Sequence, residues 1–218
     1  MYSSLSNYSH FIPSIESVRE FFSETAGEVE GKVMQGMGLG NQIFLIMTTL
    51  AYAKRSGQKA WFEHRDNYVS RPAYWNNFLV TLQPLLRHTS SHASNPYREG
   101  NGDMWYYELS IHPPHDSLEG YFQTEHYFKN EFSELYDQLR IGSFRDQIKQ
   151  RMNLTTSQPT VSLHFRLGDY KKLPGFHPIA PSSYYEKSLS YLQDELQQPF
   201  TVYYFYEKED QEAEKLKH

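Results

Sequence analysis

GKVMQGMGLGNQIFLIMTTLAYAKRSGQKAWFEH, residues 31 to 64, gives the strongest indication of the fold class. Residues 31 to 34 read as a short strand, and a glycine-rich loop follows. From Asn41 to Ser56 apolar residues recur at the spacing of one helical face, namely at Ile43, Phe44, Met47, Leu50 and Ala51. Residues 58 to 64 read as a second strand. The order strand, helix, strand is typical of a parallel α/β sheet.

Both ends of this helix carry recognisable signals. Asn41 is of a residue type that suits the N-cap, and Lys54 and Arg55 precede Gly57 at the other end. The loop in front has glycines at positions 36, 38 and 40. It is not a dinucleotide fingerprint, because the sixth position is Asn41 counted from Gly36 and isoleucine counted from Gly38. No G-K-[ST] follows either, which excludes a Walker loop.

The glycine loop therefore has two interpretations. The amide N–H groups around Gly38 and Gly40 can approach an anion at the start of a helix, where the helix dipole favours negative charge. A tight strand-to-helix turn without any ligand would need the same glycines. The loop alone does not choose between them.

The second half of the chain repeats the strand, helix, strand order. TVSLHFR, residues 160 to 166, alternates apolar and polar positions. Residues 182 to 196 predict a helix with a capping box of Ser183 and Glu186 and a buried stripe formed by Tyr185, Leu189, Leu192 and Leu196. FTVYYFY, residues 200 to 206, predicts another strand. We expect the two strands to be adjacent and parallel.

The remaining segments complete the domain organisation. Residues 87 to 104 predict a long polar surface loop, and residues 129 to 140 a helix. Shorter helices are predicted at 14 to 22 and after residue 206. TTSQPT, residues 155 to 160, reads as a linker, so we expect two α/β domains, 1–157 and 158–218.

The motif HFRLGDY, residues 164 to 170, carries the chemistry of the second domain. His164 and Arg166 project to the same side of a strand, Gly168 allows a turn, and Asp169 follows. Ligands of open α/β sheets bind beyond the carboxyl ends of strands, where a guanidinium can grip a diphosphate with paired hydrogen bonds. The alternative is a buried ion pair of Arg166 and Asp169 beside a core histidine.

Composition excludes several classes. The chain has no cysteine, so disulfides and thiolate metal sites are absent, and its formal charge of −5 without a basic block argues against nucleic acid. The sequence contains no apolar run of ~18 residues, so no membrane span is predicted. The N-terminus lacks a signal-peptide layout, so we expect a cytoplasmic protein.

HPPHD, residues 112 to 116, reads as a stiff loop without a third metal ligand. The 18 Tyr and 14 Phe are typical of carbohydrate-handling proteins, since aromatic faces stack on sugar rings, and they are equally compatible with a tyrosine-rich core and interface.

Four stretches in order resemble one known family. GMGLGNQIF (36 to 44), LEGYFQTEHYF (118 to 128), HFRLGDY (164 to 170) and FHPIAPSSYYEKSL (176 to 189) are similar to motifs of the α-1,2-fucosyltransferases and the related protein O-fucosyltransferases. The resemblance covers roughly residues 31 to 210.

The resemblance implies an inverting, GT-B-like glycosyltransferase of two Rossmann-like domains that uses a GDP-sugar, usually GDP-fucose, without a metal or other cofactor. Residues 1–157 would hold the glycan acceptor and the second domain the donor. Arg166 would hold the β-phosphate and Asn41 would lie in the same cleft, so we assign both as catalytic. Gly38, Gly40, His164 and Asp169 complete the predicted donor site.

The sequence also departs from the family. Leu167 stands where a second arginine is common, and residues 171 to 176, KKLPGF, offer no glutamate base. The base stays open between His177, Asp169 and late proton loss without a strong base. The family continues beyond a position equivalent to His218, so we expect the second domain to be incomplete, with a partner chain or oligomer completing the donor site. The alternative function is a catalytically silent protein that binds a glycan or a partner.

Overall fold

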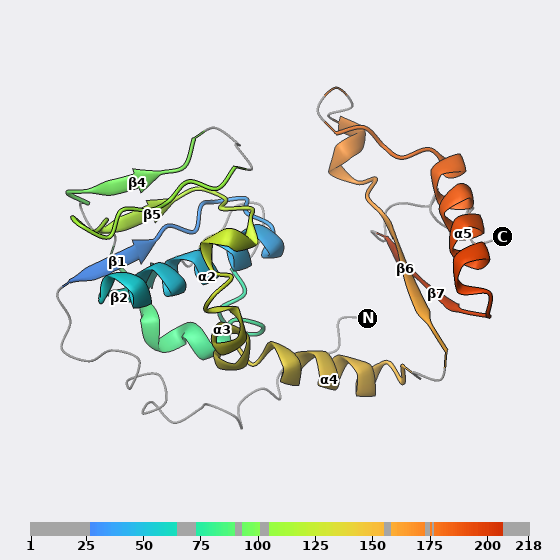
Figure 1. Ribbon diagram of the computed structural model, residues 1–218, viewed down its shortest axis with the longest axis horizontal. Helices are drawn as coiled ribbons and strands as arrows, with labels where there is room; N and C mark the ends of the chain where they lie inside the picture. Colours follow the sequence, from blue (N-terminus) through green and yellow to red (C-terminus); the bar gives the residue numbers. More distant parts are fainter. Residues whose placement is uncertain are drawn as a thin grey trace. The chain divides into compact units, whose positions relative to one another are not determined.

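The computed structural model in Figure 1 describes residues 27–64, 73–89, 93–100, 105–154, 158–172, 175 and 177–206. Contacts divide the chain into two compact units, 1–147 and 148–218. The division falls inside helix α4 (Ile141–Arg151), before the predicted linker. Each unit is described by itself. The helices predicted at 14–22 and after residue 206 lie outside the described residues.

Unit 1 is built on a five-stranded parallel sheet. Its strands are β1 (Glu28–Gly31), β2 (Lys59–Glu63), β3 (Leu86–Arg87), β4 (Pro96–Arg98) and β5 (Ser117–Glu119), in the order β3-β2-β1-β5-β4. Every neighbouring pair is parallel, and Glu28 of β1 lies opposite Lys59 of β2. The mixed α/β class and the parallel strands around residues 31 to 64 are therefore confirmed.

The first strand lies earlier in the chain than predicted. β1 ends at Gly31, whereas the prediction placed a strand at 31 to 34. Val33 belongs to the loop after β1 but is 5 % exposed and packs in the core. The loop is apolar because Val33 packs in the core, and this apolar sequence was interpreted as a strand.

Helix α2 (Leu39–Ser56) crosses the sheet and is the centre of the core (Figure 1). Its C-terminal end is as predicted, because Gly57 has the left-handed φ of 68° that caps a helix. Its N-cap is Gly38, with extended backbone and no capping side chain, so the prediction of Asn41 as N-cap is wrong. Asn41 lies in the first turn instead.

All five apolar positions predicted for one face of α2 lie in or against the core, but the buried surface of the helix is wider than that face. All residues from Leu45 to Ala53 are buried, including two threonines. The sheet contacts α2, and the short 3-10 helix η2 (Glu125–Tyr127) and helix α3 (Phe132–Gln138) also contact it. Contact with both layers explains burial on more than one face of the helix.

The segment from residue 87 to 154 contains more structure than predicted. β3 and β4 occupy part of the expected 87–104 loop, and β4 forms one edge of the sheet. Just before this segment, a second 3-10 helix, η1 (Val80–Leu85), leads into β3. The helix predicted at 129–140 is the shorter α3, and Arg140, with a φ of 54°, separates it from α4.

Unit 2 contains a strand, helix, strand motif. β6 (Thr160–Phe165) and β7 (Thr201–Tyr206) pair in parallel, as predicted, with Thr160 opposite Thr201. Leu163 and Phe165 are buried while Ser162 and His164 are exposed, which confirms the alternation.

Helix α5 (Ser182–Leu196) packs on this strand pair. The ring centroid of Phe165 lies 4.7 Å from that of Tyr185 on α5 and 6.0 Å from that of Tyr204 on β7. Tyr185 and Leu189 of the predicted buried stripe pack against the strands, and all four residues of the stripe are only half-buried. The predicted capping box is wrong, because Pro181 is the N-cap and no side chain caps the helix.

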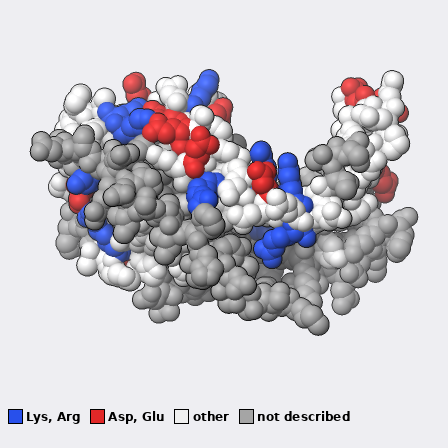
Figure 2. Space-filling model, turned by 90° about the horizontal axis from the view of Figure 1, so that it is seen from below, with Lys and Arg blue, Asp and Glu red and all other residues white. Residues whose placement is uncertain are grey.

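The described surface of unit 1 carries paired charges. Four ion pairs join Lys54 to Glu134, Arg55 to Glu131, Arg87 to Glu28 and Arg98 to Glu119. Figure 2 shows basic and acidic side chains next to one another on the face drawn. In the part of the chain that the structure describes, no helix combines the length and apolar character needed to cross a bilayer.

Candidate functional site

The carboxyl edge of the unit 1 sheet is the first candidate region. From β1 the chain builds β2 and β3 on one side, and β4 and β5 lie on the other. β1 and β5 are therefore adjacent where the strand order reverses. Open α/β sheets bind ligands outside the carboxyl ends of strands at such a reversal. The glycine loop follows β1 here, and residues 120 to 124 follow β5.

The glycine loop is anchored to the core by residues between its glycines. Met37 is 2 % exposed, and its carbonyl accepts a hydrogen bond of 2.8 Å from Nε2 of the buried Gln42. Gly36 has a φ of 83°, which favours glycine in this turn. Gly40 lies in the first turn of α2, and a Cβ added there would meet nothing within 4 Å. Gly40 is exposed, and close packing therefore does not explain why this residue is a glycine.

Asn41 and Gln123 meet at this edge. Oδ1 of Asn41 accepts a hydrogen bond of 2.8 Å from Nε2 of Gln123. Glu99 holds the turn that presents Gln123, because Oε2 of Glu99 accepts hydrogen bonds of 2.6 and 2.7 Å from the backbone N–H groups of Tyr121 and Phe122. The structure thus joins the first and second resemblance motifs.

Sequence reasoning missed a histidine pair at the same edge. His64 directly follows β2 and His88 directly follows β3, and their ring centroids lie 4.9 Å apart. The backbone N–H of His64 donates a 2.7 Å hydrogen bond to the carbonyl of Arg87. The available signal was the position of each histidine immediately after a strand, which parallel pairing brings to one edge.

The carboxyl end of β6 is the candidate region of unit 2. Arg166 is the first residue after β6, and its guanidinium carbon lies 4.8 Å from the ring centroid of Tyr170. The Tyr170 ring stacks on His177 with centroids 4.2 Å apart and planes inclined by 13°. The predicted phosphate ligand, one of the two candidate bases and an aromatic ring therefore lie in one array.

The other predicted residues of this motif differ in their positions. His164 points to the exposed face of β6, so the alternative of a core histidine is wrong. Asp169 begins the short 3-10 helix η3 (Asp169–Lys172), and its side chain lies outside the description. The ion-pair alternative with Arg166 therefore stays open. Leu167 is 8 % exposed and packs with Leu163 and Phe165, so the position of the family's second arginine is an apolar core position here.

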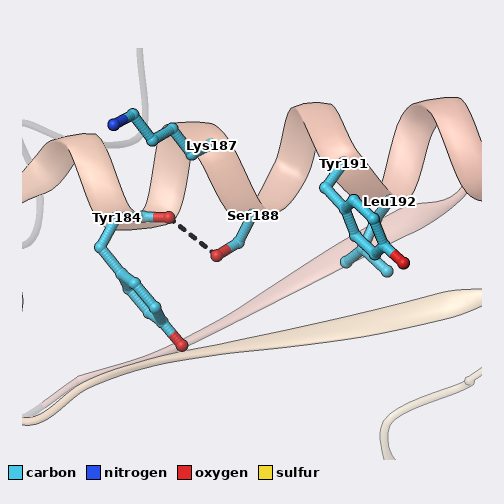
Figure 3. Close-up of a pocket in the computed structure, with 5 residues that line it drawn as sticks. All are labelled: Tyr184, Lys187, Ser188, Tyr191 and Leu192. Carbon is cyan, nitrogen blue, oxygen red and sulfur yellow. Dashed lines mark hydrogen bonds between the residues drawn. The ribbon is translucent and has the colours of Figure 1, made fainter.

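A pocket of about 440 Å³ runs along the flank of α5 (Figure 3). Its lining residues are Tyr184, Lys187, Ser188, Tyr191 and Leu192. Oγ of Ser188 donates a 2.7 Å hydrogen bond to the carbonyl of Tyr184, one turn earlier in the helix. None of the predicted site residues lines this pocket.

The HPPHD segment is organised around Asp116. Burial raises the pKa of Asp116, but hydrogen bonds from Ser94 and Asn95 outweigh it and hold that pKa below its ordinary value. The ring of His115 packs between those of Tyr52 and Tyr97, at 6.1 and 5.3 Å. Within the described ranges, no three His, Asp or Glu side chains are grouped to hold a metal ion.

Comparisons with protein-family models, curated proteins and solved structures find no match for this chain. The four sequence motifs therefore carry the resemblance alone. The structure joins them in pairs, Asn41 with Gln123 in unit 1 and Tyr170 with His177 in unit 2. The cleft predicted between the glycine loop and the end of β6 stays a prediction.

Proposed function

We propose that the protein is an inverting glycosyltransferase that transfers fucose from GDP-fucose to a hydroxyl group of a glycan. The observation that carries this proposal is the array at the carboxyl end of β6, where Arg166 lies over Tyr170 and Tyr170 stacks on His177. A half-buried cation at a parallel strand end suits a diphosphate. The finer assignment, a GT-B-like pair of Rossmann-like domains, belongs to this proposal.

Arg166 would supply the main charge in the reaction. When the acceptor oxygen attacks the anomeric carbon, the bond between that carbon and the β-phosphate oxygen breaks and GDP leaves with the electron pair. The guanidinium offsets the negative charge that develops on the diphosphate. Tyr170 limits the orientations of this guanidinium, since a cation over an aromatic face is attracted to it. The acceptor proton passes to a base, for which His177 and Asp169 are candidates.

The glycine loop would support the donor or the acceptor from unit 1. Gly40 leaves open space beside the first turn of α2, where backbone N–H groups favour an anion. Asn41 is held by Gln123, which fixes its amide in one orientation at the sheet edge. Both features support close approach of a polar ligand to the loop.

A thermal-shift panel of GDP, GDP-fucose, UDP and ADP tests the proposal. GDP and GDP-fucose should raise the melting temperature and the other two should not. A ligand at 100 times its Kd stabilises the folded state by about 2.7 kcal/mol, which such a panel resolves. GDP-fucose should also be consumed in the presence of glycan acceptors.

A silent glycan-binding protein is the second candidate. Trp105, Tyr106 and Tyr107 are 73 %, 45 % and 46 % exposed, and exposed aromatic rings favour ligand binding over core packing. If no nucleotide stabilises the protein and no fucose is transferred, this second candidate replaces the first.

A further inference from the structure

A second pocket, in unit 1, lies at the other end of α2 from the glycine loop. Its volume is about 240 Å³, and its lining residues are Arg55, Tyr106, Glu108, Leu109, Ile111, His126 and Asn130. Arg55 is in the last turn of α2, whereas Gly38 precedes the first. With a rise of about 1.5 Å per residue, the helix separates the two by about 25 Å. The pocket is therefore distinct from the glycine loop.

Hydrogen bonds fix the walls of this pocket. Nη1 of Arg55 donates to the carbonyl of Tyr127 at 2.9 Å and to Oε2 of Glu131 at 3.0 Å. The hydroxyl of Tyr127 accepts a 3.2 Å hydrogen bond from the backbone N–H of Tyr107. These contacts join the end of α2, the segment before β5 and the turn after η2. A ligand would meet a preformed site and would lose little free energy to ordering it.

The polar groups at the pocket favour a neutral ligand with several hydroxyls. The charge of Arg55 is already engaged by Glu131, and Glu108 adds a carboxylate, which disfavours a phosphate. Glu108, His126 and Asn130 are exposed at the pocket and offer both acceptors and donors. Such a mixture matches hydroxyl groups, which donate and accept in the same way.

Aromatic rings complete the site. Tyr106 is half-exposed and packs on His126 and Tyr127, with ring centroids 5.8 and 5.0 Å apart. Its neighbour Trp105 is 73 % exposed. The C–H face of a pyranose stacks on such rings, which present an apolar face next to polar groups. The volume lies below the ~300–1,000 Å³ of pockets for drug-sized ligands, so one sugar ring suits it.

We infer that this pocket binds one pyranose residue of a glycan, with Tyr106 as the stacking surface and Glu108 and Asn130 as hydrogen-bonding groups. If the proposed transfer takes place beside the glycine loop, the bound residue is a part of the glycan other than the one that carries the reacting hydroxyl. The inference does not rest on the proposed transfer reaction, because a silent glycan-binding protein would use the same pocket.

Tryptophan fluorescence gives a direct readout. Trp61 and Trp75 are 4 % and 2 % exposed, so Trp105 is the exposed tryptophan of the described residues. We would titrate the full chain, without nucleotide, with the methyl β-pyranosides of galactose, glucose and N-acetylglucosamine and with lactose. At least one should change the emission of the exposed tryptophan, with a Kd on the order of 1 mM. Saturation-transfer NMR on the same saccharide should give the same Kd.

Variants locate the binding site. Tyr106→Ala should weaken saccharide binding about tenfold, because a stacked aromatic contact is lost. Glu108→Gln should weaken saccharide binding severalfold, because the amide replaces one of the two acceptor oxygens of the carboxylate with an NH2 donor. Phe205→Ala is the matched control, since Phe205 is an aromatic residue that is 49 % exposed on β7 and should leave binding unchanged. Circular dichroism checks that each variant is folded.

Two results would overturn the inference. One is the absence of saturation transfer for all four saccharides, and the other is equal binding by wild type, Tyr106→Ala and Glu108→Gln. Either can occur while GDP-fucose is still consumed, so failure here is distinct from failure of the proposed function. Conversely, saccharide binding without nucleotide binding would support the pocket and reject the transferase.

Discussion

Asn41 and Gln123 lie 82 positions apart in the sequence, and their side-chain amides form a hydrogen bond of 2.8 Å at the carboxyl edge of the unit 1 sheet. The bond connects the first turn of α2 with the turn that follows β5. The segments that follow the parallel strands β1 and β5 are thereby held together beside the glycine loop. The fixed amide of Asn41 is the feature that links structure and proposed function in this unit.

Asn41→Ala and Gln123→Ala separate a structural role of this hydrogen bond from a catalytic role of Asn41. A typical hydrogen bond contributes about 0.5–1.5 kcal/mol, and Gln123 is exposed, so each variant should lower the free energy of unfolding by about 1 kcal/mol or less. The double variant should cost no more than the larger single change, as a denaturation-based mutant cycle can measure. Fucose transfer should fall far more in Asn41→Ala than in Gln123→Ala. Equal losses would make Asn41 a structural residue.

Arg166 is expected to dominate nucleotide affinity. Arg166→Lys keeps the positive charge but loses the planar guanidinium, which can donate two parallel hydrogen bonds to a phosphate, so GDP affinity should fall. Arg166→Ala should abolish transfer and lose about 1.5–3 kcal/mol of binding free energy, roughly ten- to over a hundredfold in Kd. Isothermal titration with GDP measures this. Arg145→Ala, at an arginine 62 % exposed, is the control. GDP binding unchanged in both Arg166 variants would contradict the donor-site assignment.

Two glycines near α2 should respond in opposite ways to alanine. In Gly31→Ala the new Cβ would lie 2.7 Å from Oγ1 of Thr49 and close to the Phe62 ring, so about 1–3 kcal/mol of stability should be lost. Gly40→Ala meets open space in a helical turn and should be neutral or stabilising by about 0.5–1 kcal/mol. Urea unfolding measures both. If the loop approaches a diphosphate, Gly40→Ala should nevertheless weaken GDP binding, and unchanged binding would favour the ligand-free turn.

Tyr52 should be a stability residue of the core. Its hydroxyl donates to the carbonyl of Ser110 and accepts from the backbone N–H of His115, both at 2.6 Å, and its side chain is 0 % exposed. Tyr52→Phe leaves two backbone groups without this partner and should cost about 1–3 kcal/mol. Tyr184→Phe, at a tyrosine 59 % exposed, should change stability by less than about 0.5 kcal/mol. Similar melting temperatures for the two variants would argue against this role.

The ion pair of Glu28 and Arg87 should make stability depend on pH. Two hydrogen bonds of 2.6 and 2.7 Å from Arg87 hold the pKa of Glu28 below its ordinary value. A lowered folded pKa stabilises the fold at neutral pH, and this contribution is lost as pH falls through that pKa. Both side chains are more than 40 % exposed, so Glu28→Gln should cost only about 0.2–1 kcal/mol at neutral pH. Unfolding at successively lower pH should show the wild type and the variant converging, whereas a constant difference would contradict this.

Local features of the chain were predictable from its residues. The glycine C-cap after Lys54 and Arg55 and the alternation in β6 each depend on neighbours within a few residues, and each is present. Parallel pairing of β1 with β2 and of β6 with β7 follows from the helix between each pair. The motif containing Arg166 was recognisable for the same reason, because its residue types and spacing are continuous in the chain.

Contacts between segments far apart in the chain became known from the three-dimensional fold. Burial of α2 on more than one face, the edge strand β4 and the pocket beside Tyr106 depend on residues that lie tens of positions apart. The pairings of Asn41 with Gln123 and of His64 with His88 arise at strand ends that only the sheet brings together. Periodicity reports one face of one element, whereas packing depends on the partner of that face. For this reason a buried loop residue such as Val33 was read as strand, and Gly38 rather than Asn41 begins the helix.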